Sequence, residues 1–190
     1  MSITKPGQRK LQILQALAGM LENPKGEKIT TAALAAKIDV SEATLYRHFA
    51  SKAQMFEGLM EFIESSIFGL INQITVQDKD GISQALNISV MLLSFAERNP
   101  GMTRVLIGDA LVNEDERLQA QMNHLMDRLE LAFKQSLRQA AALGQVPEAE
   151  VALRANLLCS FIMGRWHRYA KSGFKALPTE NAQVQLSLLL

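Results

Sequence analysis

The sequence has few of the features that mark secreted or membrane proteins. It contains one cysteine, Cys159, so no intramolecular disulfide can form, and a reducing compartment is indicated. No window approaches the roughly 18 unbroken apolar residues of a membrane span. No N-terminal apolar run resembles a signal peptide. These absences predict a cytoplasmic protein without a membrane span.

Patterns of catalytic and metal-binding residues are equally scarce. The three histidines, His48, His124 and His167, are scattered and form no cluster with ligand spacing. The sequence contains no phosphate-cradling glycine loop and no readable pair of nucleophile and base. Cys159 is more simply a small buried apolar residue than a catalytic thiol. We therefore predict that the chain is not an enzyme and holds no metal and no cofactor.

The chain also lacks a strong net charge, because 20 basic residues face 19 acidic ones. This balance excludes a protein that binds nucleic acid through a uniformly basic surface. The charge is nevertheless uneven. Residues 1–52 carry eight basic and four acidic residues, a net charge of +4, while the remainder carries 12 basic and 15 acidic residues, a net charge of −3. The N-terminal part is therefore the part expected to meet an anionic partner.

Alternating β-branched residues are almost absent, and apolar residues recur at helical spacing throughout. The pattern predicts an all-α protein of about nine helices. We expect a small N-terminal bundle in residues 1–52 and a larger helical bundle in residues 53–190. Thr30 or Thr31 is suited to cap one short helix and Ser41 the next, and Ser51 with Gln54 forms a capping box for a long helix.

The stretch SEATLYRHFASK, residues 41–52, predicts the second helix of a helix-turn-helix. On a helical wheel Leu45 and Phe49 form one apolar stripe, which can pack on Leu34 and Ile38 of the preceding helix. Only three residues separate the two helices. The rest of the 41–52 helix is therefore expected to face outward.

The outward face of this helix suits DNA. Ala43 and Thr44 are small enough to let the helix lie deep in a major groove, where Thr44 and Arg47 can reach base edges. Tyr46 and His48 flank this face and can contact the two phosphate walls. Further contacts with the sugar-phosphate backbone of DNA are expected from Arg9, Thr30, Thr31 and Lys52. An ordinary solvated helix surface is the alternative interpretation.

The segment ITTAALAAKIDVSEATLYRHFASKAQMFEGL, residues 29–59, resembles the DNA-binding signature of TetR-family transcriptional regulators. The resemblance implies an all-α homodimer with a three-helix DNA-binding domain and a regulatory bundle. It also implies recognition-helix roles for Ser41 and Glu42. Asp39 stands in the turn where many members have glycine, and Asp also tolerates a left-handed conformation.

The remaining sequence is similar to the nucleoid occlusion factors, a group with the TetR fold. Residues 59–67, 95–111, 113–130 and 172–180 carry this similarity. It implies a protein that binds chromosomal sites and keeps the tubulin-like division protein FtsZ from forming a septum over the nucleoid. The partner face implied by the resemblance includes Phe62, Met91 and Arg98. Core packing of Phe62 and a helix-terminal role for Arg98 are the alternatives.

The last two long helices are expected to form the dimer interface. Their apolar stripes can join those of a second copy in a four-helix bundle. The predicted interface residues are Leu118, Met122, Leu125, Leu129, Leu158, Ile162 and Trp166. Such a dimer would place two recognition helices roughly 34–36 Å apart on a palindromic site in double-stranded DNA. A ligand-responsive repressor with an apolar cavity is the alternative function, although a small-molecule ligand is not expected.

Overall fold

A computed structural model describes residues 6–23 and 29–190, and their regular structure is entirely helical. Within these residues the α-helices are α1 (Pro6–Leu21), α2 (Thr31–Lys37), α3 (Glu42–Tyr46), α4 (Lys52–Gln77), α5 (Gly81–Arg98), α6 (Pro100–Leu106), α7 (Glu116–Ala142), α8 (Val151–Lys171) and α9 (Ala182–Leu186). Two short 3₁₀ helices, η1 (Asp109–Leu111) and η2 (Glu148–Glu150), precede α7 and α8. The all-α prediction with about nine helices is confirmed.

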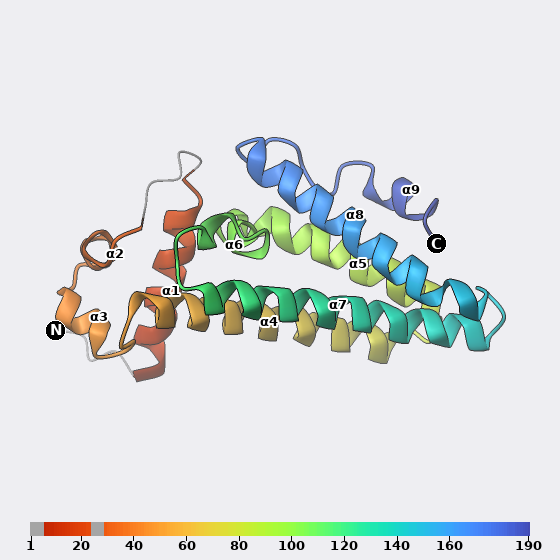
Figure 1. The fold of residues 1–190 in the computed structure, drawn as a ribbon, viewed down its shortest axis with the longest axis horizontal. Helices are drawn as coiled ribbons and strands as arrows, with labels where there is room; N and C mark the ends of the chain where they lie inside the picture. The colour runs from red at the N-terminus through yellow and green to blue at the C-terminus, as the bar shows by residue number, and fades with distance from the viewer. Residues whose placement is uncertain (1–5, 24–28) are drawn as a thin grey trace.

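The helices form an elongated bundle with a small group of helices at one end (Figure 1). The long helices α4 and α7 run side by side along the molecule, and α5 and α8 cover them. Helices α1, α2 and α3 lie together at the N-terminal end of α4, where α1 also contacts α6. The short helices α2 and α3 therefore lie at the far end of the molecule, away from most of the bundle.

Side-chain caps set the starts of α2, α3 and α4, as the sequence predicts. In each case a hydroxyl oxygen accepts a hydrogen bond from the backbone N–H three residues later. These caps are Thr30 for α2 (3.1 Å), Ser41 for α3 (3.3 Å) and Ser51 for α4 (3.1 Å). Gln54 completes the last cap by accepting from the backbone N–H of Ala50 at 2.9 Å. Each cap contributes on the order of 1 kcal/mol.

One hydrophobic core runs from the N-terminal helices into the bundle. It includes Ile13 and Leu17 of α1 and continues to Trp166 of α8, which is fully buried and donates from Nε1 to the Leu92 carbonyl at 3.2 Å. Helix α6 approaches α1 closely at Gly101, where an added Cβ would lie 2.0 Å from the carbonyl oxygen of Ala18. Only glycine permits this approach. The division into domains at residues 52 and 53 stays a prediction.

The predicted dimer-interface residues lie in the core of a single chain, so this assignment needs correction. Each is at most 3% exposed where α7 and α8 pack on the rest of the bundle: Leu118, Met122, Leu125, Leu129, Leu158, Ile162 and Trp166. Side chains without exposed surface cannot add area to contact with a second copy. Helical periodicity identifies a buried face, but it does not say whether the same chain or another chain buries it.

Candidate nucleic-acid interface

The turn between α2 and α3 holds the two short helices at a fixed angle. Asp39 has φ 54°, in the left-handed region expected for the position where many TetR-family members have glycine. The backbone N–H of Val40 bonds back to the carbonyl of Ala35 at 3.0 Å. These contacts close the end of α2. They direct the chain into α3 after only four residues, 38–41.

Helix α3 is held down by the two residues that the helical wheel selects. Leu45 and Phe49 are buried, and so is Leu34 of α2 in the same core. The Phe49 ring also meets α1, because the Lys10 ammonium lies 5.5 Å from its centroid. The predicted anchor is therefore confirmed, and it leaves the opposite face of α3 open to solvent.

The outward face of α3 carries the predicted groove residues. Ala43, Tyr46 and Arg47 are exposed, and Thr44 is half-buried. Arg47 donates from Nη2 to Thr44 Oγ1 at 3.0 Å, and the hydroxyls of Thr44 and Ser41 lie 3.0 Å apart. This short chain of hydrogen bonds holds the guanidinium over the face that would enter a major groove. Arginine and threonine are side chains that read base edges.

The other predicted DNA contacts sit around this face, and some are already hydrogen-bonded. The Thr31 hydroxyl donates to the Glu42 carboxylate at 2.5 Å, and Tyr46 donates to Thr31 over a long 3.5 Å. Glu42 therefore ties α3 to α2 in this structure. The exposed Thr30 serves as the cap of α2. The half-buried His48 lies beside Arg47.

The two basic residues at the edges of this region both have side-chain partners. Arg9 of α1 donates from Nη1 to Gln12 Oε1 at 3.0 Å. Lys52, at the first position of α4, forms an ion pair with Glu114, which lies in the connection before α7. Its ammonium also lies 5.6 Å from the centroid of the Phe56 ring. The ion pair escapes prediction from sequence because its partners are 62 residues apart.

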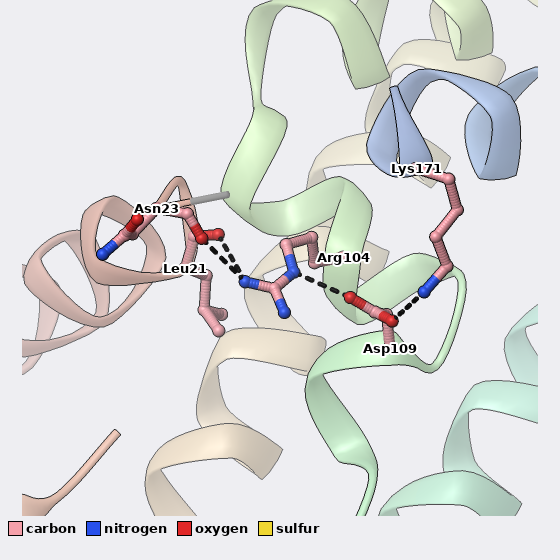
Figure 2. Close-up of polar contacts among 5 residues, drawn as sticks. All are labelled: Leu21, Asn23, Arg104, Asp109 and Lys171. Atoms are coloured by element: carbon pink, nitrogen blue, oxygen red, sulfur yellow. Dashed lines mark hydrogen bonds and ion pairs between the residues drawn. The ribbon is translucent and has the colours of Figure 1, made fainter. Parts of the chain in front are cut away.

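A second polar contact joins the N-terminal helices to the bundle (Figure 2). Arg104 of α6 donates from Nη1 to the carbonyl oxygens of Leu21 (3.3 Å) and Asn23 (3.1 Å), at the end of α1. Its Nε donates to Asp109 at 2.9 Å, and Asp109 also pairs with Lys171 of α8. Burial would raise the pKa of Asp109, but the hydrogen bonds from Lys171 and Arg104 outweigh it and lower that pKa. Asp109 thus stays ionised and joins α6 to α8.

The three predicted partner-face residues lie on two helices that pack together, α4 and α5. Phe62 of α4 is 36% exposed, Arg98 at the end of α5 is exposed and Met91 is half-buried. The Phe62 carbonyl accepts from the hydroxyls of Ser65 (3.0 Å) and Ser66 (2.7 Å). Accessible apolar and cationic atoms are therefore present on this face. Its role in binding a partner stays a prediction.

Helix α8 exposes a row of residues, of which the sequence suggested Ser160 and Gly164 for close approach in a dimer but not the apolar ones. Along this helix Leu153, Leu157, Ser160 and Gly164 follow at steps of four and three, with Met163 beside them. Leu131 on α7 is also exposed. Leu157, Ser160 and Gly164 lie on the side of α8 opposite Trp166, whereas Met163 borders the same small cavity as Trp166. The sequence of α8 contains this row as a second pattern of apolar and small residues at steps of three and four, shifted relative to the buried pattern.

One small apolar cavity lies between α5, α7 and α8. The apolar cavity bordered by Leu92, Phe133, Cys159 and Trp166 measures about 10 Å³, room for roughly one water molecule. Burial, with a smaller contribution from Glu130, raises the pKa of the Cys159 thiol to about 12. The thiol is therefore protonated at neutral pH. This space is far too small for the ligand of a ligand-responsive repressor.

Neither a membrane-spanning helix nor a metal-binding cluster occurs within residues 6–23 and 29–190. No helix in this part of the chain combines the length and apolar character needed to cross a membrane. In the same residues, histidine, cysteine and carboxylate side chains form no group of three that could hold a metal ion.

Comparison with protein families divides the chain into two matched regions. Residues 27–59 match the family described as bacterial regulatory proteins, tetR family. Residues 79–190 match the family described as tetracyclin repressor-like, C-terminal domain. The first region contains α2 and α3, and the second begins just before α5.

Similar proteins extend over nearly the whole chain. A protein of Alteromonas mediterranea named nucleoid occlusion factor SlmA is 48% identical over 97% of this chain and 95% of its own length. A protein of the same name from Idiomarina loihiensis is 48% identical over 95% of this chain and 93% of its own length. These relatives and families are regulatory proteins and not enzymes, which confirms that prediction.

Solved structures show the same fold at low sequence identity. The fatty acid degradation regulator FadR from Bacillus halodurans superposes with a TM-score of 0.83 at 14% identity, covering 98% of this chain and 97% of that one. The TetR family regulator PfmR from Thermus thermophilus superposes with a TM-score of 0.78 at 20% identity, covering 94% of this chain and 97% of that one. The helix-turn-helix, the two family matches and the full-length relatives agree: the chain belongs to the TetR family of bacterial regulatory proteins and, within it, to the family of the SlmA proteins.

Proposed function

We propose that the protein is a sequence-specific DNA-binding homodimer that acts as a nucleoid occlusion factor and inhibits FtsZ assembly over the chromosome. The observation that carries the proposal is 48% identity over 97% of the chain to a relative with that name. In this proposal residues 1–52 form the DNA-binding domain, and residues 53–190 form the dimerisation and partner-binding domain. The protein then resides on the nucleoid.

The exposed face of α3 is the proposed DNA-reading surface. Ala43, Thr44 and Arg47 enter the major groove, and Tyr46 and His48 contact the phosphates on either side. The buried Leu45 and Phe49 support this orientation, because they fix which face of α3 is turned outward. Further proposed contacts come from Ser41, Glu42, Thr30, Thr31, Arg9 and Lys52.

Replacing Arg47 or Tyr46 with alanine should weaken DNA binding and leave the fold and the dimer intact. A side chain that reads a base edge contributes roughly 1–3 kcal/mol, so Arg47→Ala should raise the dissociation constant about 5-fold to 150-fold. Both residues are exposed, so stability should change little. Gel-shift titration at fixed salt measures the effect. Arg138→Ala, an exposed arginine on α7, is the matched control, and unchanged affinity in both α3 variants would refute the groove assignment.

The exposed row of α8 is the proposed dimer interface, in place of the buried residues that the sequence suggested. Leu153, Leu157 and Met163 supply apolar area, and Ser160 and Gly164 allow the backbones to approach closely. Two copies of α7 and α8 would then pack as a four-helix bundle around a twofold axis. Such a dimer presents two copies of α3 to a palindromic site.

The face formed by Phe62, Met91 and Arg98 is the proposed docking site for FtsZ. The decisive experiment is FtsZ polymerisation, followed by light scattering or pelleting, with the protein alone and with its DNA. We expect the DNA-bound protein to reduce polymer, and Phe62→Ala combined with Arg98→Ala to abolish the reduction. Val76→Ala is the matched control, because Val76 is an exposed apolar residue on α4 about 21 Å from Phe62 along the helix. If the amount of FtsZ polymer were the same with and without the protein and its DNA, the FtsZ part of the proposal would be refuted and the protein would be an ordinary DNA-binding regulator.

A further inference from the structure

The ion pair between Lys52 and Glu114 joins a predicted DNA contact to the helical bundle. Lys52 occupies the first position of α4, the helix that follows the recognition helix, and Glu114 comes from the connection between α6 and α7. The two side chains are only 22% and 15% exposed. We propose that Glu114 substitutes for a DNA phosphate, occupies Lys52 in the free protein and thereby lowers its affinity for DNA. The inference rests on the proposed DNA binding.

The backbone of the segment around Glu114 fixes the position of this residue. We call residues 108–115 the connecting segment. Two of its residues have left-handed backbones, Gly108 with φ 75° and Asn113 with φ 65°. The backbone N–H of Glu114 bonds to the Leu111 carbonyl at 3.0 Å, and the next residue, Asp115, caps α7. The carboxylate is therefore presented by a shaped turn that is fixed on both sides.

The connecting segment is also anchored at its other end. Figure 2 shows Arg104 reaching from the carbonyls at the end of α1 to Asp109, which in turn meets Lys171 of α8. The segment is thus linked to the end of α1 through Arg104, and Glu114 joins it directly to the start of α4. Because the segment is fixed, the flexible side chain of Lys52 is the part that must move when DNA binds.

The chemistry of the pair explains the direction of the effect. The lysine ammonium is a point charge on a flexible four-carbon chain, and it can exchange a carboxylate for a phosphate. While it is bound to Glu114, the DNA-facing surface carries one fewer uncompensated positive charge. Moving Lys52 to DNA leaves Glu114, which is largely buried, without its partner. The free energy lost when Glu114 is left unpaired offsets part of the free energy that Lys52 gains by contacting the phosphate.

The test replaces Glu114 with glutamine, which keeps the shape of the side chain and removes its charge. We expect Glu114→Gln to bind DNA about threefold to tenfold more tightly at low salt. The slope of log affinity against log salt concentration should stay close to that of the wild-type protein, because Lys52 neutralises the same phosphate in both complexes. Fluorescence anisotropy with one labelled operator duplex across a salt series measures both quantities.

Two comparisons separate this mechanism from a general charge effect. Glu116→Gln removes the same charge two residues away, at an exposed position, and should change affinity much less. In a Lys52→Met background, Glu114→Gln should have no effect. Equal or weaker binding by Glu114→Gln, or an equal gain in the Lys52→Met background, would overturn the inference. Failure of the wild-type protein to bind any duplex would instead refute the proposed function.

Discussion

Replacing Trp166 with alanine is expected to lower the free energy of unfolding by about 3–5 kcal/mol, the usual cost of removing a fully buried aromatic side chain. Trp166 is 0% exposed, and its Nε1 donates to the Leu92 carbonyl of α5 at 3.2 Å. The substitution therefore leaves a cavity where α5 and α8 meet and removes a buried hydrogen bond. A loss of this size is a large fraction of the stability of an ordinary domain.

Urea denaturation followed by far-ultraviolet circular dichroism measures this loss at several protein concentrations. Circular dichroism is needed because Trp166 is the only tryptophan, so the variant has no tryptophan fluorescence. Trp166→Phe is the control, and it should lose less stability because it retains most of the buried volume. Near wild-type stability combined with weakened association would place Trp166 at the dimer interface and contradict its assignment to the core.

In the proposed dimer, replacing Leu157 with glutamate should have the opposite effect: the two copies dissociate, and the stability of each chain changes little. Leu157 lies near the middle of the exposed row on α8. In a twofold interface the substitution buries two carboxylates, one from each copy, and neither gains a partner. We expect the dissociation constant of the dimer to rise at least about 100-fold, corresponding to roughly 2.8 kcal/mol.

Sedimentation equilibrium measures the association, and a gel shift on a palindromic duplex reports the loss of paired half-sites. Leu177→Glu is the matched control, because the two leucines have nearly the same exposed fractions, 44% for Leu157 and 45% for Leu177, and Leu177 lies outside the row. Its association should equal that of the wild-type protein. A Leu157→Glu protein that remains dimeric would move the interface away from α8.

Most of the N-terminal fold follows from local sequence signals. Thr30, Ser41 and Ser51 begin helices because their hydroxyls bond backbone amides only three residues away. Leu45 of α3 and Phe49, three residues beyond the end of α3, share one buried side because they are four residues apart. Their burial leaves one orientation for the remaining side chains. The face proposed to read DNA could therefore be predicted without a structure.

The polar contacts around the candidate site could not be predicted in the same way. Sequence reasoning left Lys52 free to meet a phosphate, and the structure pairs it with Glu114. It gave Glu42 a role on DNA, and the structure bonds this residue to Thr31. The partner of a charged side chain depends on which segments the fold brings together. Spacing along one helix contains no information about a residue 62 positions away.

The sequence alone determined the helical class, the starts of α2, α3 and α4 and the outward face of α3, because all three depend on interactions between residues within one or two turns. The tertiary structure alone decided which face of α7 and α8 is buried within the chain and which faces solvent. Two apolar stripes compete for burial on α8. The packing of α5 and α7 against Trp166 leaves the row containing Leu157 exposed. Which stripe is buried depends on contacts between helices that are far apart in the chain. The spacing of apolar residues within α8 does not show which of its two stripes these contacts will cover.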